Sequence, residues 1–86
     1  MTWEVAWTNR STRDLRRLSQ ADARRVIEAV EHLAVVESGD VRPLRGRATG
    51  EWRLRVGAIR VLFVFLSDSQ TIQVRRVLPR GRAYRD

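Results

Sequence analysis

Arginine is the residue type in this sequence with the clearest capacity for chemistry. The 86 residues include 17 basic and ten acidic ones, which gives a net charge of +7, and every basic residue is an arginine. A guanidinium group stays charged and presents a planar fork of donors, so it can bind a phosphate through two hydrogen bonds. A GC-rich genome would also favour arginine over lysine. The surplus of arginine favours a phosphate-rich partner, of which RNA is the first candidate.

Other kinds of chemistry find little support in the composition. The chain has no cysteine, which excludes disulfides and thiolate metal sites, and its single histidine, His32, excludes a nuclease that uses a histidine pair. It contains no Gly-rich phosphate loop and no acyl-transfer triad. We therefore expect no metal and no cofactor. With no long apolar run and no secretory signal, we expect one cytoplasmic domain, residues 1–86, without membrane contact.

The elements that must position the arginines follow from the hydrophobic pattern. Polarity alternates in short, β-branched runs, and one amphipathic stretch has helical spacing. The turn-rich segment 41–50 is expected to be a loop or an irregular strand. The pattern predicts an α+β fold of order β-α-α-β-β-β, with two helices packed on one face of an antiparallel sheet. The expected elements are a strand at 3–7, helices from Thr8 or Asn9 to about Leu18 and from Ser19 to Ser38, and strands at 51–56, 59–66 and 71–78.

A two-residue turn at Gly57-Ala58 fixes the register of the central hairpin. It places Arg55 directly opposite Arg60, and Arg53 falls on the same face because side chains alternate along a strand. The opposite face is uniformly apolar and forms the core. We call the face that carries these three arginines the arginine face; Leu62 and Val64 lie on it as well.

The arginine face has two interpretations. Solvated arginines that splay apart are the simpler interpretation for any single residue. Three arginines that converge on one hairpin favour an anion site, because like charges opposite one another on a sheet cost about 0.2–1 kcal/mol and Thr or Gln would avoid this. We favour the anion site, with an apolar floor and cationic walls.

The last strand requires a choice of register. Arg76 would fall on the core side unless a bulge near Arg75 shifts the register. We favour the bulge, which returns Val77 to the core and turns Leu78 and Arg80 toward the arginine face. The tail that follows then leaves the sheet beside this face.

Several of these segments together resemble the RelE/ParE toxins of bacterial toxin–antitoxin pairs, and the resemblance covers the whole chain. It implies a microbial-RNase-like fold, the RelE fold. For the RelE branch it implies metal-independent cleavage of mRNA on the ribosome through attack by a ribose 2′-OH. The segments that carry the resemblance are Leu44-Arg45-Gly46, Trp52-Arg53-Leu54-Arg55-Val56-Gly57, Arg60-Val61-Leu62-Phe63, and Arg80 with Tyr84.

The resemblance also implies roles for individual residues. RelE-like enzymes often have Lys at the basic positions of the second strand, where this chain has Arg, and many have His-Arg before the final Tyr, where this chain has Pro79-Arg80. Tyr84 could transfer a proton or stack on a base, and both roles stay open. The expected catalytic residues are Arg53, Arg55, Arg60, Arg80 and Tyr84, and the expected RNA-binding residues are Arg45, Arg47 and Arg82.

The partners implied by the resemblance are a cognate antitoxin protein, the ribosome and mRNA, with operator DNA bound only through the antitoxin complex. Two alternatives remain open. The ParE branch inhibits DNA gyrase and needs no nuclease residues. A non-enzymatic nucleic-acid-binding module could use the same basic face.

Overall fold

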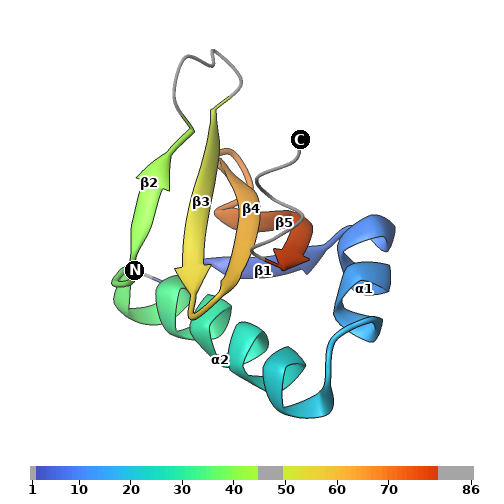
Figure 1. Cartoon of the computed structure of the whole chain (residues 1–86). Helices are drawn as coiled ribbons and strands as arrows, with labels where there is room; N and C mark the ends of the chain where they lie inside the picture. Colours follow the sequence, from blue (N-terminus) through green and yellow to red (C-terminus); the bar gives the residue numbers. More distant parts are fainter. Residues whose placement is uncertain (1, 45–49, 80–86) are drawn as a thin grey trace.

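The computed structural model describes residues 2–44 and 50–79. These residues form two helices and five strands, and the predicted α+β fold is confirmed (Figure 1). The segment left open between a loop and an irregular strand contains a short strand. The elements are β1 (Glu4–Trp7), α1 (Asn9–Arg16), α2 (Gln20–Val36), β2 (Val41–Pro43), β3 (Glu51–Val56), β4 (Ile59–Leu66) and β5 (Thr71–Pro79).

Both helices begin at the predicted capping residues. The hydroxyl of Thr8 accepts a hydrogen bond from the N–H of Ser11 at 3.1 Å, and that of Ser19 accepts from the N–H of Asp22 at 3.1 Å. Each bond satisfies a backbone donor that has no partner inside its helix. α2 ends at Glu37, which has a left-handed φ of 57°. These caps fix where α2 begins and ends beneath the sheet.

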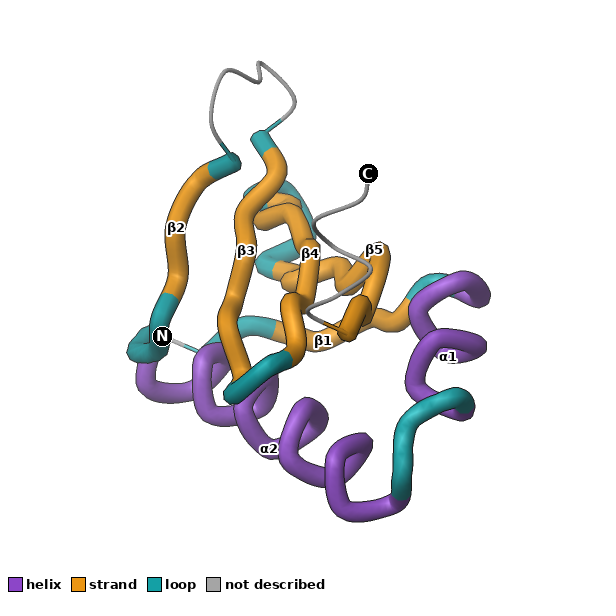
Figure 2. The backbone as a smooth tube through the Cα atoms, in the orientation of Figure 1, coloured by secondary structure: helices purple, strands orange, loops and turns teal. Residues whose placement is uncertain are grey.

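The sheet is mixed rather than wholly antiparallel, which corrects the prediction. Its strand order is β1-β5-β4-β3-β2, and β1 runs parallel to β5 while the other neighbours are antiparallel. Hairpin turns impose antiparallel pairing only on strands that they connect. β1 and β5 are joined by no such turn, because both helices and three strands separate them in the sequence, and Figure 2 shows the two strands side by side.

The core lies between the sheet and the helices, on one face of the sheet, as predicted. Val26 and Val30 of α2 are fully buried against sheet residues such as Phe63, which is 1% exposed. Leu15 and Leu18, in and just after α1, pack against the same cluster. Because both helices occupy this face, the arginine face is the opposite one. Neither helix in the described part of the chain is long and apolar enough to cross a membrane.

A single carboxylate ties α1 to the last strand. β1 pairs with β5 only as far as Val74, so no described strand flanks the second half of β5 on that side. There Oδ2 of Asp14 accepts hydrogen bonds from Nε of Arg76 and from the N–H of Val77, both at 2.9 Å. The side chain of Asp14 thus forms hydrogen bonds with the second half of β5, as the backbone of β1 does with the first half.

Candidate functional site

The central hairpin has the predicted register at every pair. Arg55 lies across from Arg60 and Arg53 across from Leu62, so all four side chains share one face. Gly57 supplies the positive φ, 59°, that a tight hairpin turn requires, and Ala58 has none. The turn therefore determines the register, and with it which side chains lie on the arginine face.

The predicted bulge in β5 is also present. Val74 pairs with Phe63 and Arg76 pairs with Leu62, so Arg75 is the extra residue. The shift returns Val77 to the core, where it is 1% exposed. After the bulge, successive side chains again alternate between the two faces of the sheet, each on the face opposite to the one it would occupy without the extra residue.

The apolar floor of the arginine face is larger than the hairpin alone predicts. Leu78 pairs with Arg60 across the sheet, which places it on this face. Val64 and Leu78 are both buried, at 5% and 8% exposed, and Leu62 is half-buried. An apolar floor lowers the local dielectric, so charges beside it interact more strongly than they would in water.

Arg53 is the most unusual residue of the arginine face. It is only 8% exposed, and its NH1 atom is buried without a hydrogen-bond partner in the part of the chain described. Burial lowers the pKa of Arg53, and the charge of Arg55 lowers it further; Asp40 opposes this, while Arg60 and Arg42 add to the lowering. Buried donors nearly always have partners, so a buried guanidinium nitrogen without one among the described residues is unusual.

Arg55 and Arg60 flank this buried group with greater exposure. Arg55 is exposed, and Arg60 is half-buried. The three arginines therefore range from nearly enclosed to solvent-facing on adjacent strands. This arrangement can hold an anion, since a guanidinium donates several hydrogen bonds and carries a fixed charge.

Five of the eight predicted site residues lie outside the described residues. They belong to segments 45–49 and 80–86 of the sequence. Their predicted roles in catalysis and RNA binding therefore stay predictions. They are Arg45, Arg47, Arg80, Arg82 and Tyr84.

The arginine face also carries Arg42 and Arg76, which are not among the predicted site residues. Arg42 of β2 lies directly across from Arg53, and Arg76 lies across from Leu62. Arg76 is held by Asp14 in a bond that joins residues 62 apart in sequence. The bulge implied the position of Arg76, whereas no periodicity in segment 41–50 indicated a face for Arg42.

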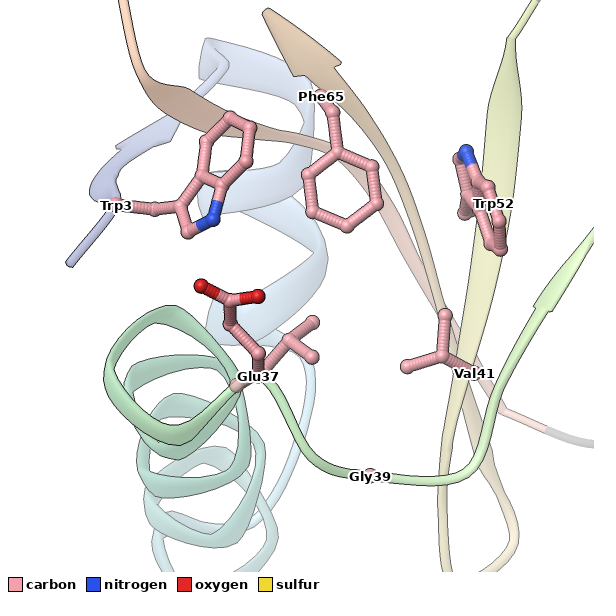
Figure 3. Close-up of a pocket in the computed structure, with 7 residues that line it drawn as sticks. Trp3, Glu37, Gly39, Val41, Trp52 and Phe65 are labelled. Carbon is pink, nitrogen blue, oxygen red and sulfur yellow. The ribbon is translucent and has the colours of Figure 1, made fainter. Parts of the chain in front are cut away.

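The helix side of the sheet carries a different feature, an aromatic pocket of about 410 Å³ (Figure 3). Phe65 stands between two tryptophans there, with ring centroids 5.0 Å from Trp3 and 5.6 Å from Trp52. Both tryptophans are partly buried and pack against the core. The carboxylate of Glu37 faces the rings, so this pocket does not suit a phosphate. Its lining residues are Trp3, Leu33, Glu37, Gly39, Val41, Trp52 and Phe65.

No group of three or more His, Cys, Asp or Glu residues that could hold a metal ion occurs among residues 2–44 and 50–79. The described site is thus a set of guanidinium groups over an apolar floor. Such a set can bind phosphate oxygens and stabilise negative charge that develops on them.

Comparison with known proteins gives one family. Residues 5–84 match the model of the ParE toxin of the type II toxin-antitoxin system, parDE. No curated protein sequence matches the chain. The match spans both helices and all five strands apart from the first residue of β1.

Solved structures give the same fold. A chain of the RelBE2 toxin–antitoxin complex from Mycobacterium tuberculosis is 27% identical, with a TM-score of 0.81 over 93% of this chain and 100% of that one. A chain of the archaeal RelE–RelB complex from Pyrococcus horikoshii is 29% identical, with a TM-score of 0.76 over 95% and 99%. A mutant of the E. coli toxin RelE in the free state is 16% identical, with a TM-score of 0.76 over 98% and 90%, and shows the fold alone.

Proposed function

The chain belongs to the RelE/ParE superfamily of type II toxin–antitoxin toxins, and from this we propose that it is an endoribonuclease that cleaves mRNA on the ribosome. Such an activity inhibits translation and belongs to the cytoplasm, where ribosomes work. The arginine face is the proposed site.

The buried guanidinium of Arg53 supports this proposal most directly. Its NH1 lacks a partner within the described residues, and three further arginines act on it electrostatically. Burying a charge without a partner is unfavourable, and functional sites are where such local costs are retained. A phosphate oxygen would supply the missing acceptor.

The proposed reaction is an internal transesterification. The ribose 2′-oxygen loses its proton and bonds to the adjacent phosphorus, the bond from phosphorus to the 5′-oxygen breaks, and the departing 5′-oxygen takes up a proton. The products carry a 2′,3′-cyclic phosphate and a 5′-OH. Arg53 and Arg60, with Arg80 as a further candidate, stabilise the charge that the phosphorane gains.

The proton transfers need another group. The resemblance to RelE toxins gives Arg55 the position of a proton-transfer residue, but a guanidinium group that stays charged is a poor base. Tyr84 or RNA of the ribosome itself is the candidate for this role. The arginine face is accordingly better suited to holding the phosphorane than to moving its protons.

The expected partner protein is a cognate antitoxin. Two similar solved chains come from complexes of a toxin with its antitoxin, RelBE2 and RelE–RelB. A chain of net charge +7 with a cationic face is readily neutralised by an acidic segment that covers that face.

The test is cleavage of a defined mRNA with and without translating ribosomes, with the new 5′ ends mapped. Ribosome-dependent cuts in phase with codons support the proposal. If the wild type leaves the mRNA intact in the presence of ribosomes, the nuclease proposal is wrong. If an Arg60→Ala, Tyr84→Phe double variant cuts the mRNA as the wild type does, the assignment of the site is wrong.

Inhibition of DNA gyrase is the second candidate, because the matching family model is that of the ParE toxin. Inhibition of gyrase would not require Arg53 to contact a phosphorane. DNA breaks that depend on gyrase, with intact mRNA in the same cells, would select it.

A further inference from the structure

A second cross-strand pair of arginines extends the arginine face beyond the predicted set. Arg42 on β2 is the direct partner of Arg53 on β3, just as Arg55 is of Arg60. Directly opposed residues of antiparallel strands point to the same face. The face therefore carries two arginine pairs across three adjacent strands.

The two pairs are offset along β3 by two residues. At about 3.4 Å per residue, the pairs are roughly 6.8 Å apart along the strand. This offset is comparable with the separation of successive phosphates in a nucleic acid strand. Arg42, which lies across from Arg53, could therefore contact one phosphate while Arg53, Arg55 and Arg60 contact its neighbour.

Arg42 has the freedom to make such a contact. It is exposed, and within residues 2–44 and 50–79 its side chain forms no ion pair or hydrogen bond. It stands close enough to Arg53 to act on its charge, and Asp40 is the acid that opposes this effect. The local excess of positive charge is unfavourable in the free protein and is relieved by an anion.

We propose that Arg42 forms a second phosphate subsite, which binds the phosphate next to the one held by Arg53, Arg55 and Arg60 on a single RNA strand. The inference rests on the proposed function, since it takes RNA as the substrate. Arg42 is a substrate-binding residue in this arrangement and takes no part in bond breaking. Its contribution is to align the strand along the sheet.

The test compares Arg42→Gln with Arg24→Gln, a change on α2 that alters the net charge equally. The probe is a short, fluorescently labelled single-stranded RNA, 2′-O-methylated throughout so that it cannot be cleaved. Arg42→Gln should weaken binding about tenfold and flatten the dependence of affinity on salt by about one phosphate contact. Arg24→Gln should change neither by a comparable amount.

A second arm locates the contact. Each probe in a series carries one uncharged methylphosphonate at a different position, and wild type should bind these probes more weakly than the unmodified RNA. At one position, the methylphosphonate should not weaken the binding of Arg42→Gln any further. That position should be adjacent to the one that loses its effect in Arg60→Gln. Equal affinities and salt slopes for Arg42→Gln and Arg24→Gln would overturn the inference.

The inference and the proposed function fail in different ways. If wild type binds the probe but cuts no mRNA on ribosomes, the nuclease proposal is wrong and the binding comparison still decides the role of Arg42. If wild type does not bind the probe but cuts mRNA on ribosomes, the inference is wrong and the nuclease proposal stands.

Discussion

Arg55 of β3 lies directly across from Arg60 of β4, next to the turn that joins the two strands. A like-charge pair at this position opposes folding, because the register brings two guanidinium groups together on one face. The pair is therefore better explained by the binding of a ligand than by a contribution to the stability of the fold. The predictions that follow separate what holds the fold together from what the arginines do.

A double-mutant cycle measures the cost of this pair. Arg55→Thr, Arg60→Thr and the double variant should show an unfavourable coupling between the two arginines of about 0.2–1 kcal/mol. The measurement is the free energy of unfolding from urea titration at low salt, and added salt should reduce the coupling. A favourable coupling would contradict the account of the face as an anion site.

Asp14 should be among the most important polar residues for stability. It is 6% exposed and accepts hydrogen bonds from Arg76 and from the N–H of Val77. Asp14→Ala removes both bonds and leaves a buried donor, so it should lower the free energy of unfolding by about 2–3 kcal/mol. Asp22→Ala, a change at the exposed ion pair with Arg25, is the control and should cost under about 1 kcal/mol.

The stability of the fold should depend on pH through the same residue. Burial alone would raise the pKa of Asp14, but the hydrogen bonds from Arg76 and Val77 and the charges of Arg76 and Arg17 hold it below its ordinary value. A carboxyl whose pKa is lower in the folded state stabilises that state above its ordinary pKa of about 3.9, and this is lost as pH falls through the lowered value.

The comparison for this pH dependence is Asp14→Asn. Wild type should be the more stable protein near neutral pH, and the difference should shrink as the solution is acidified below about pH 4. Thermal unfolding of both proteins across this range is the measurement. A difference that stays constant with pH would show that the charge of Asp14 is not what stabilises the fold.

Glu37 offers a change that should stabilise the protein. Its left-handed φ of 57° at the end of α2 is unfavourable for a residue with a Cβ atom. Glu37→Gly should raise the free energy of unfolding by about 1 kcal/mol. Glu31→Gly, an exposed change inside α2, should instead lower it by about 1 kcal/mol, and a loss of stability in both variants would contradict the assignment of this cap.

The parts of the fold that sequence predicts well are those set by local rules. The register at Gly57 follows from a two-residue turn, and the bulge at Arg75 follows from the need to keep Val77 in the core. Both are decided by alternation within a few residues. The capping hydroxyls of Thr8 and Ser19 are equally local.

The parts that sequence does not predict depend on distant partners. The parallel pairing of β1 with β5 joins the two ends of the described chain, and no turn specifies its direction. The bond from Arg76 to Asp14 spans 62 residues, so neither residue signals the other. Arg42 lies in a strand of three residues, too short for a periodic pattern, and its place on the arginine face follows only from its pairing with Arg53.

The most direct test of the central claim is the rate at which Arg53→Met cleaves mRNA on programmed ribosomes. Met fills similar space without burying a charge, so the free energy of unfolding should be unchanged or higher than that of wild type. The cleavage rate should nevertheless fall about 10²–10³-fold, because a donor to the phosphorane is lost. Arg24→Met on α2 is the control and should keep the wild-type rate. A stable Arg53→Met that cleaves mRNA as fast as Arg24→Met would contradict the claim that the arginine face is the catalytic site.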